Sequence, residues 1–192
     1  MMLNVLLIGN GAREHAVAEA IMRSSRRSKL FSYMKTNNPG IASLSEEIAI
    51  GGYGELAAIS KFARACNVDF AVIGPEEPLN KGVADALRDA GIPSVGPSKN
   101  LARLESSKSF TRHLLEKYRI PGNPEFKTFS SLNGIGEFLD ELDGIVIKPD
   151  GLTGGKGVMV QGDHFQKRLP LAATVNFRQS VNLRGHVIFI LP

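Results

Sequence analysis

Two glycine-rich segments hold the residue types that suit phosphate chemistry. The first, Gly151–Gly157, has four glycines in seven residues and contains Lys156, and Lys148 stands shortly before it. Glycine-rich turns let backbone N–H groups approach phosphate oxygens, and a lysine ammonium neutralises phosphate charge. Lys156 is not followed by Ser or Thr, and no helix is predicted after it, so the segment is not a P-loop. We expect phosphate contacts here; the alternative is a mobile hairpin with solvated lysines.

The second segment, Gly9–His15, follows the apolar run Leu3–Ile8 and opens a predicted helix. Glycines let a phosphate approach the backbone there, and a helix N-terminus favours an anion. Two features argue against a dinucleotide-binding site of the G-x-G-x-x-G type. Glu14 occupies the position of the third glycine, and Thr36 and Asn37 follow the second strand, where such a site requires an acidic residue. Three interpretations stay open: a sugar-phosphate or phosphate site, a tight turn without a ligand, and a dinucleotide site.

Adjacent carboxylates, Glu76 and Glu77, lie in the segment Gly74–Pro78. They could hold a hydroxyl or an amine, and the alternative is a solvated acidic turn. The ordinary pKa of histidine lies near neutrality, so His15 could act in acid–base chemistry, but a structural role is the alternative. Cys66 has apolar neighbours and is expected to pack in a core.

Alternating strands and helices must position these segments. Apolar runs predict strands at 3–8, 30–34, 69–73 and 94–95, and amphipathic segments predict helices at 13–23, 53–66 and 81–90. This alternation predicts an α/β fold with a parallel, Rossmann-like sheet wound on both faces. Ligands bind such sheets at the carboxyl ends of the strands. We therefore expect the loops at 9–15, 37–40, 74–78 and 96–98 to meet at one edge.

A different pattern begins near residue 100. It predicts helical structure over 101–118 in two pieces, a strand at 126–129, a helix at 130–142, and strands at 144–148 and 156–161. The change of pattern predicts a domain boundary between about residues 98 and 105.

Composition excludes several classes of protein. The chain has 192 residues, 43% hydrophobic and 22% charged, which is ordinary for a globular protein. A single cysteine cannot form an internal disulfide, and there is no Cys/His cluster for zinc. The apolar runs are too short to cross a bilayer, so we expect a cytoplasmic protein without a membrane partner. The net charge of +4 arises wholly within residues 166–192, so no nucleic-acid partner is predicted.

Six blocks in this order resemble the phosphoribosylamine–glycine ligase (glycinamide ribonucleotide synthetase) family, ATP-grasp enzymes of purine synthesis. The blocks are Gly9–Ala16, Asn38–Gly40, Gly74–Leu79, Gly96–Lys99, Ser107–Phe110 and Lys148–Val158. The resemblance implies a pre-ATP-grasp domain over residues 1–100, which helps bind phosphoribosylamine, and the start of an incomplete ATP-grasp portion over 101–165.

The resemblance also implies roles for residues. The substrate site would comprise Gly9, Gly11, Arg13, Glu14, His15, Pro75 and Glu76. The ATP site would comprise Lys108, Lys148, Gly154, Gly155, Lys156 and Gly157. ATP would phosphorylate the glycine carboxylate, and the amine of phosphoribosylamine would then attack the acyl phosphate. Magnesium or manganese would assist in the family. No catalytic residue is assigned within this chain, and no metal ligand is expected in it.

Residues 166–192 show no such resemblance and contain no Asp or Glu, so they offer no carboxylate to magnesium. We expect a truncated chain or a change of reading frame near residue 165, and in either case we do not expect ligase activity from this chain alone. We also expect self-association through an exposed half-site. Two other functions stay open: a non-catalytic module that binds a sugar phosphate, and a dinucleotide-dependent oxidoreductase.

Overall fold

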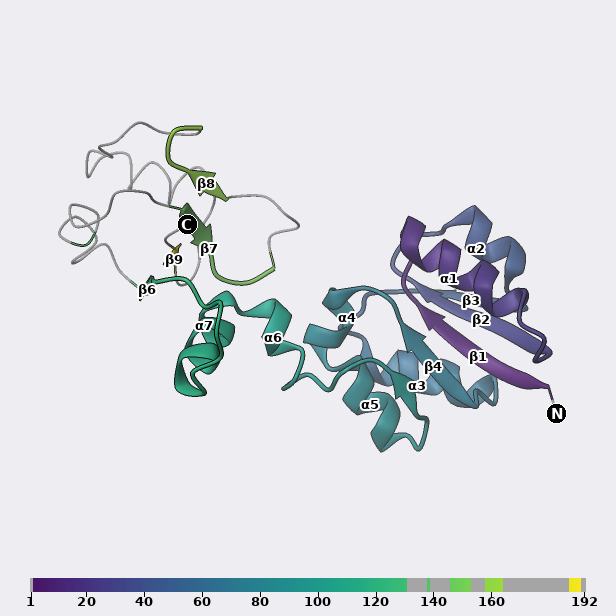
Figure 1. Cartoon of the computed structure of the whole chain (residues 1–192). Coiled ribbons are helices and arrows are strands. Elements are labelled where there is room, and N and C mark those ends of the chain that lie inside the picture. Colours follow the sequence, from purple (N-terminus) through teal and green to yellow (C-terminus); the bar gives the residue numbers. More distant parts are fainter. Residues whose placement is uncertain (1, 131–137, 139–145, 153–157, 164–186, 191–192) are drawn as a thin grey trace. The chain divides into compact units, whose positions relative to one another are not determined.

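A computed structural model describes residues 2–130, 138, 146–152, 158–163 and 187–190 (Figure 1). The chain divides into an N-terminal unit, Met1–Arg103, and a C-terminal unit, Leu104–Pro192. No helix in the described part is long and apolar enough to cross a membrane.

The N-terminal unit is built on a five-stranded sheet whose strand order is β3-β2-β1-β4-β5. Every neighbouring pair is parallel, which agrees with the predicted fold class. The strands are β1 (Leu3–Ile8), β2 (Ser28–Met34), β3 (Glu47–Ile50), β4 (Phe70–Ile73) and β5 (Ser94–Val95). The apolar residues of β1, Val5–Ile8, are almost wholly buried because helices cover both faces of this central strand.

Five helices cover the sheet: α1 (Ala12–Met22), α2 (Pro39–Leu44), α3 (Leu56–Ala65), α4 (Glu76–Lys81) and α5 (Val83–Asp89). Leu7 and Leu30 pack with Ala18 of α1 and Ile41 of α2 on one face. The second cluster, on the other face, joins strand residues such as Leu6 to Ile59 of α3 and Leu87 of α5.

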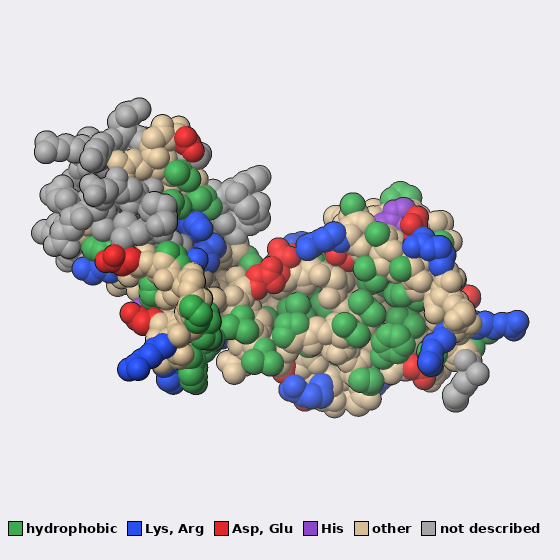
Figure 2. All heavy atoms as spheres, viewed as in Figure 1, with side chains coloured by type: hydrophobic (Ala, Val, Ile, Leu, Met, Phe, Trp, Pro, Cys, Tyr) green, Lys and Arg blue, Asp and Glu red, His purple; other side chains and the backbone are tan. Residues whose placement is uncertain are grey.

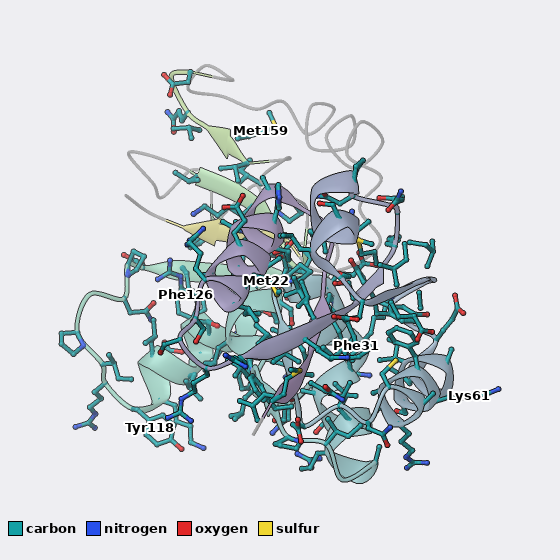
Figure 3. All side chains as sticks on the ribbon, turned by 90° about the vertical axis from the view of Figure 1, so that its right-hand side faces the viewer. Met22, Phe31, Lys61, Tyr118, Phe126 and Met159 are labelled. Carbon is teal, nitrogen blue, oxygen red and sulfur yellow. The ribbon has the colours of Figure 1, made fainter. Side chains whose placement is uncertain are left out.

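Side chains follow the same division between interior and surface. Figure 3 labels Phe31 of β2, which is only 8% exposed, and Lys61 of α3, which points outward into solvent. On the face drawn in Figure 2, hydrophobic side chains of this unit lie centrally, and Lys and Arg are spread around the border among Asp and Glu.

Three short elements differ from the sequence-based expectation. The expected loop at 37–40 runs into α2, whose first turn is capped by Asn38 Oδ1 accepting from the N–H groups of Gly40 and Ile41. Strand β3 escaped prediction because it lies at the sheet edge and most of its residues are exposed. The segment 74–78 is partly helical, since α4 begins at Glu76.

The C-terminal unit combines helices and an antiparallel sheet. Helix α6 (Arg103–Ser106) begins at the division between the units, and α7 (Lys108–Lys117) follows. The sheet has the order β6-β9-β7-β8, with β6 (Phe126–Phe129), β7 (Val146–Pro149), β8 (Met159–Val160) and β9 (Val187–Ile190). Strand β9, which comes from the segment 166–192, pairs with both β6 and β7. Of the helix expected at 130–142, only Ser130 and Phe138 belong to the described residues, and the rest of that prediction lies outside them.

Candidate functional site

The two strand ends at the centre of the sheet carry Gly9 and Gly74. Ile8 of β1 pairs with Ile73 of β4, and the N–H of Gly74 donates to Ile8 O at 3.0 Å. Chain order reverses between these strands, because β2 lies on one side of β1 and β4 on the other. Such a reversal opens a crevice at the carboxyl ends of the strands, where α/β proteins bind ligands.

Glu14 fills the space between these two strand ends. Its side chain is buried, and its Oε2 accepts from the N–H of Gly11 at 2.7 Å, as in a capping box at the start of α1. A Cβ atom placed on Gly9 or on Gly74 would lie 2.4 Å from Glu14 Cγ. Both glycines are therefore required by the packing of Glu14, independently of any ligand. The predicted contact of Glu14 with substrate stays a prediction.

The start of α1 offers donors to an anion. The N–H groups of Ala12 and Arg13 lie in the first turn and have no acceptor among the described residues, because a helix leaves its first N–H groups unpaired. The Arg13 guanidinium is 78% exposed and lies 3.6 Å from Glu76 Oε2. Helix dipole, free N–H groups and an exposed cation together suit a phosphate group.

Asn10, between the two glycines of the turn, is held by residues from two neighbouring strand ends. Its Nδ2 donates to Thr36 Oγ1 at 2.9 Å, and its Oδ1 accepts from the Tyr53 hydroxyl at 2.6 Å. Its carbonyl accepts from Asn38 Nδ2 at 3.0 Å. Thr36 therefore serves the turn as a hydrogen-bond partner, at the position where a dinucleotide site requires an acidic residue.

Tyr53 is 4% exposed, and its environment keeps the phenol protonated. Burial, with smaller contributions from the charges of Glu14 and Glu77, raises the pKa of Tyr53 to about 12, although a hydrogen bond with the backbone of Lys35 opposes this shift. The hydroxyl therefore acts as a donor toward Asn10 at neutral pH.

The predicted pair of carboxylates begins a helix. Glu76 and Glu77 occupy the first turn of α4, where acidic side chains are favoured by the helix dipole. Lys35 Nζ lies 3.1 and 3.2 Å from the two carboxylate oxygens of Glu77. Pro75, the N-cap, packs so closely that a Cβ atom on Gly9 would lie 2.8 Å from its Cδ. Glu76 thus faces Arg13 of α1, and Glu77 faces Lys35, which follows β2.

His15 packs on the first turn of α2. A Cβ atom on Gly40 would lie 2.3 Å from its Cε1, so the imidazole covers that glycine. Its Nε2 lies 3.7 Å from Glu19 Oε1, one turn further along α1. These contacts describe a packing role, and its predicted contact with substrate stays a prediction.

The structure thus gathers Gly9, Gly11, Arg13, Pro75 and Glu76 at the edge of the sheet and adds residues that sequence reasoning did not assign. Lys35, Thr36 and Asn38 could have been found, since they follow the second predicted strand directly. Tyr53 gave no such signal, because the strand that precedes it was itself missed.

In the C-terminal unit, one carboxylate joins the start of α7 to the turn after β7. Asp150 Oδ2 accepts from the hydroxyls of Ser107 and Ser109, at 3.2 and 2.5 Å. Its Oδ1 accepts from the N–H groups of Ser109 and Gly151, at 3.3 and 3.0 Å. Burial alone would raise the pKa of Asp150, but these hydrogen bonds outweigh it and hold the pKa below its ordinary value.

Two of the lysines predicted to bind ATP lie beside this junction. Lys108 is the first residue of α7, where a cation opposes the helix dipole, and its Nζ donates to Gly151 O at 2.7 Å. Burial lowers the pKa of Lys108; the charge of Asp150 opposes this shift, and the charge of Lys148 adds a smaller contribution to it. Lys108 and Lys148 repel each other, and the negative charge of a bound polyphosphate would relieve this repulsion. Gly154, Gly155, Lys156 and Gly157 lie outside the described residues.

The described residues do not supply a set that fits magnesium. Among residues 2–130 and the shorter described segments after them, no group of three or more His, Cys, Asp or Glu side chains could hold a metal ion.

Sequence comparisons match both parts of the chain to one enzyme family. Residues 3–105 match the family model "Phosphoribosylglycinamide synthetase, N domain", and residues 106–175 match the ATP-grasp (A) domain of the same enzyme. A phosphoribosylamine–glycine ligase of Methanopyrus kandleri is 48% identical over 167 residues, 86% of this chain and 37% of the relative. That of Methanosarcina acetivorans is 42% identical over 189 residues, 98% of this chain and 42% of the relative.

Solved structures share the fold. A phosphoribosylamine–glycine ligase from Thermotoga maritima superposes with a TM-score of 0.70 at 22% identity, over 98% of this chain and 43% of that chain. An ADP complex of N5-carboxyaminoimidazole ribonucleotide synthetase superposes with a TM-score of 0.75 at 18% identity, over 98% of this chain and 46% of that chain.

The chain spans about 37% of the length of the first curated relatives that it matches. The N-domain model alone accounts for more than half of its residues, and the ATP-grasp match follows directly. The chain therefore belongs to the phosphoribosylglycinamide synthetase family, with sequence of both its N domain and its ATP-grasp domain.

Proposed function

We propose that this protein takes part in the ATP-dependent ligation of glycine to phosphoribosylamine in purine synthesis, within the cytoplasm. The observation that carries the proposal is the match of two consecutive family domains, each of which coincides with a site that suits phosphate. The Gly9–Gly11 turn would receive the phosphoribosyl group, and the Lys108–Lys148 region would receive the ATP phosphates.

The reaction divides between these sites. Transfer of the ATP γ-phosphoryl group to the glycine carboxylate would give ADP and glycyl phosphate. The amine of phosphoribosylamine would then attack the acyl carbon and expel phosphate. Lys108 and Lys148 would neutralise charge on the transferring phosphoryl group, and the start of α1 with Arg13 would hold the second substrate in place. Magnesium is expected from the family chemistry and is assigned no ligand among the described residues.

A second candidate is a module that binds the sugar phosphate without catalysis. One observation favours it: the free N–H groups of α1 and the side chain of Arg13 all lie within the N-terminal unit. This candidate predicts binding of ribose 5-phosphate without glycine-dependent release of ADP. Self-association, which we expected from an exposed half-site, would be seen as a concentration-dependent mass in sedimentation.

Calorimetry and an ADP-release assay on the 192-residue chain test the proposal. The ligase predicts ATP binding, and ADP release that requires both glycine and phosphoribosylamine. Lys148→Ala should weaken ATP binding by roughly tenfold or more, because a hydrogen bond to a charged group contributes about 1.5–3 kcal/mol. Lys117→Ala, at the exposed end of α7, is the matched control and should leave ATP binding unchanged.

The outcomes separate the candidates. ADP release that needs both co-substrates supports the ligase. Binding of ribose 5-phosphate without any ATP binding rejects the ligase for this chain and supports the binding module. Equal ATP affinity of Lys148→Ala and the unaltered chain removes Lys148 from the site.

A further inference from the structure

Tyr53 is buried beside the candidate sugar-phosphate site and has no role in the proposed reaction. It follows β3 and precedes α3, so its side chain comes from a third strand end, separate from those that carry Gly9 and Thr36. Its hydroxyl reaches Asn10 Oδ1 at 2.6 Å, across 43 residues of sequence. A buried hydroxyl needs a partner, and here the partner is the central residue of the Gly9–Gly11 turn.

The hydrogen bonds of Asn10 leave its side chain little freedom. Tyr53 donates to Oδ1, and Nδ2 donates to Thr36 Oγ1, so the two ends of the amide have different partners. Asn38 Nδ2 fixes the Asn10 carbonyl, and Glu14 fixes the next N–H, that of Gly11. The backbone that leads into α1 is thus held from both sides before any ligand arrives.

We propose that Tyr53 is a positioning residue of the sugar-phosphate site: through Asn10 it holds the Gly9–Gly11 turn so that the free N–H groups at the start of α1 converge on a phosphate. The inference rests on the proposed function and deepens it. Pre-ordering a binding turn increases affinity because less conformational freedom is lost when the ligand binds.

Tyr53→Phe isolates the hydroxyl, since the ring that packs in the core is kept. The matched control is Tyr33→Phe, which removes a second buried tyrosine hydroxyl from the same hydrophobic cluster without removing a contact to the turn. The probe is ribose 5-phosphate, titrated into the 192-residue chain by calorimetry. We expect the Kd to rise about three- to tenfold in Tyr53→Phe and to stay unchanged in Tyr33→Phe.

A double-mutant cycle separates positioning from general destabilisation. In an Asn10→Ala background, Tyr53→Phe should cause no further loss of affinity, because its effect passes through Asn10. Losses that simply add would overturn the proposal, as would an unchanged Kd in Tyr53→Phe.

Amide hydrogen exchange tests the ordering of the turn without any ligand. Tyr53→Phe should speed exchange of the Gly9 and Gly11 N–H groups, which are bonded to Tyr33 O and Glu14 Oε2, by about fivefold. If the unaltered chain does not bind ribose 5-phosphate, the proposed function of this site fails. In that case faster exchange still supports the ordering of the turn by Tyr53, and unchanged exchange overturns it.

Discussion

Each unit has a glycine-rich turn, at Gly9 in the N-terminal unit and at Gly151 in the C-terminal unit. The physical reason why glycine is required differs between the two turns. At Gly9, φ is +137° and a Cβ atom would collide with the side chains of Glu14 and Pro75. At Gly151, φ is +97°, but an added Cβ atom would meet no atom of the described residues within 4 Å. The first glycine is required by close packing as well as by backbone conformation, and the second by conformation alone. The same residue type therefore reports two different physical constraints.

The two turns also differ in how they are held. Loops after β1, β2 and β3 meet at Asn10, and the loop after β4 meets them through Glu14. At the C-terminal turn, one carboxylate, that of Asp150, accepts four hydrogen bonds from Ser107, Ser109 and Gly151. Removal of the Asp150 side chain should therefore destabilise its turn more than removal of any one partner of Asn10 destabilises the Gly9–Gly11 turn.

The largest expected difference between the two turns is in the loss of stability caused by glycine-to-alanine substitutions. Gly9→Ala combines a strained φ with overpacking against buried Glu14, and should lower the stability of the N-terminal unit by about 3–5 kcal/mol. Gly151→Ala adds only the conformational cost, about 1–2 kcal/mol. Urea unfolding followed by circular dichroism measures both.

Gly54→Ala is the control for these substitutions, because an added Cβ atom there meets nothing and φ lies outside the left-handed range. It should change stability by less than about 0.5 kcal/mol. Equal losses at Gly9 and Gly151 would show that Glu14 can move aside, and would remove the distinction between the turns.

The Asp150 junction predicts a smaller effect, confined to the C-terminal unit. Asp150→Asn removes the negative charge and replaces one of the two acceptor oxygens with an amide donor, and it should lower the stability of that unit by about 2–3 kcal/mol. Hydrogen exchange of the α7 amides measures it. Asp163→Asn, at an exposed carboxylate, is the matched control and should have no effect.

The same junction predicts a pH dependence. Because the pKa of Asp150 is lowered in the folded chain, its contribution is fully present above the unfolded value of about 3.9 and is lost as pH falls through the folded value. Exchange of the α7 amides should therefore accelerate below about pH 4 relative to Asp150→Asn, after correction for intrinsic rates. Parallel profiles in the two proteins would argue that Asp150 is not ionised when folded.

The smallest expected effect concerns the ion pair between Lys35 and Glu77. Both side chains are about half exposed, at 53% and 44%, so solvent screens their attraction. Lys35→Met should change stability by less than about 1 kcal/mol, and less still at high salt. Urea unfolding at low and high salt checks this, and a loss as large as that of Gly9→Ala would show that the pair organises the turn.

The sequence alone determined the alternation of strands and helices, the parallel sheet of the N-terminal unit and its gathering of glycine-rich loops at one edge. Those features depend on apolar periodicity and on local turn residues, both of which can be recognised along the chain. The short elements α2, β3 and α4 escaped because each has six residues or fewer and too little periodicity to identify it.

Only the tertiary structure decided what the individual site residues do. Glu14 was noticed as a departure from a glycine pattern, but its packing against Gly9 and Gly74 depends on the pairing of β1 with β4. The contact of Tyr53 with Asn10 and that of Asp150 with Ser107 each span 43 residues of sequence. Contacts of that range are set by strand order and loop closure, and no local pattern in the chain encodes them.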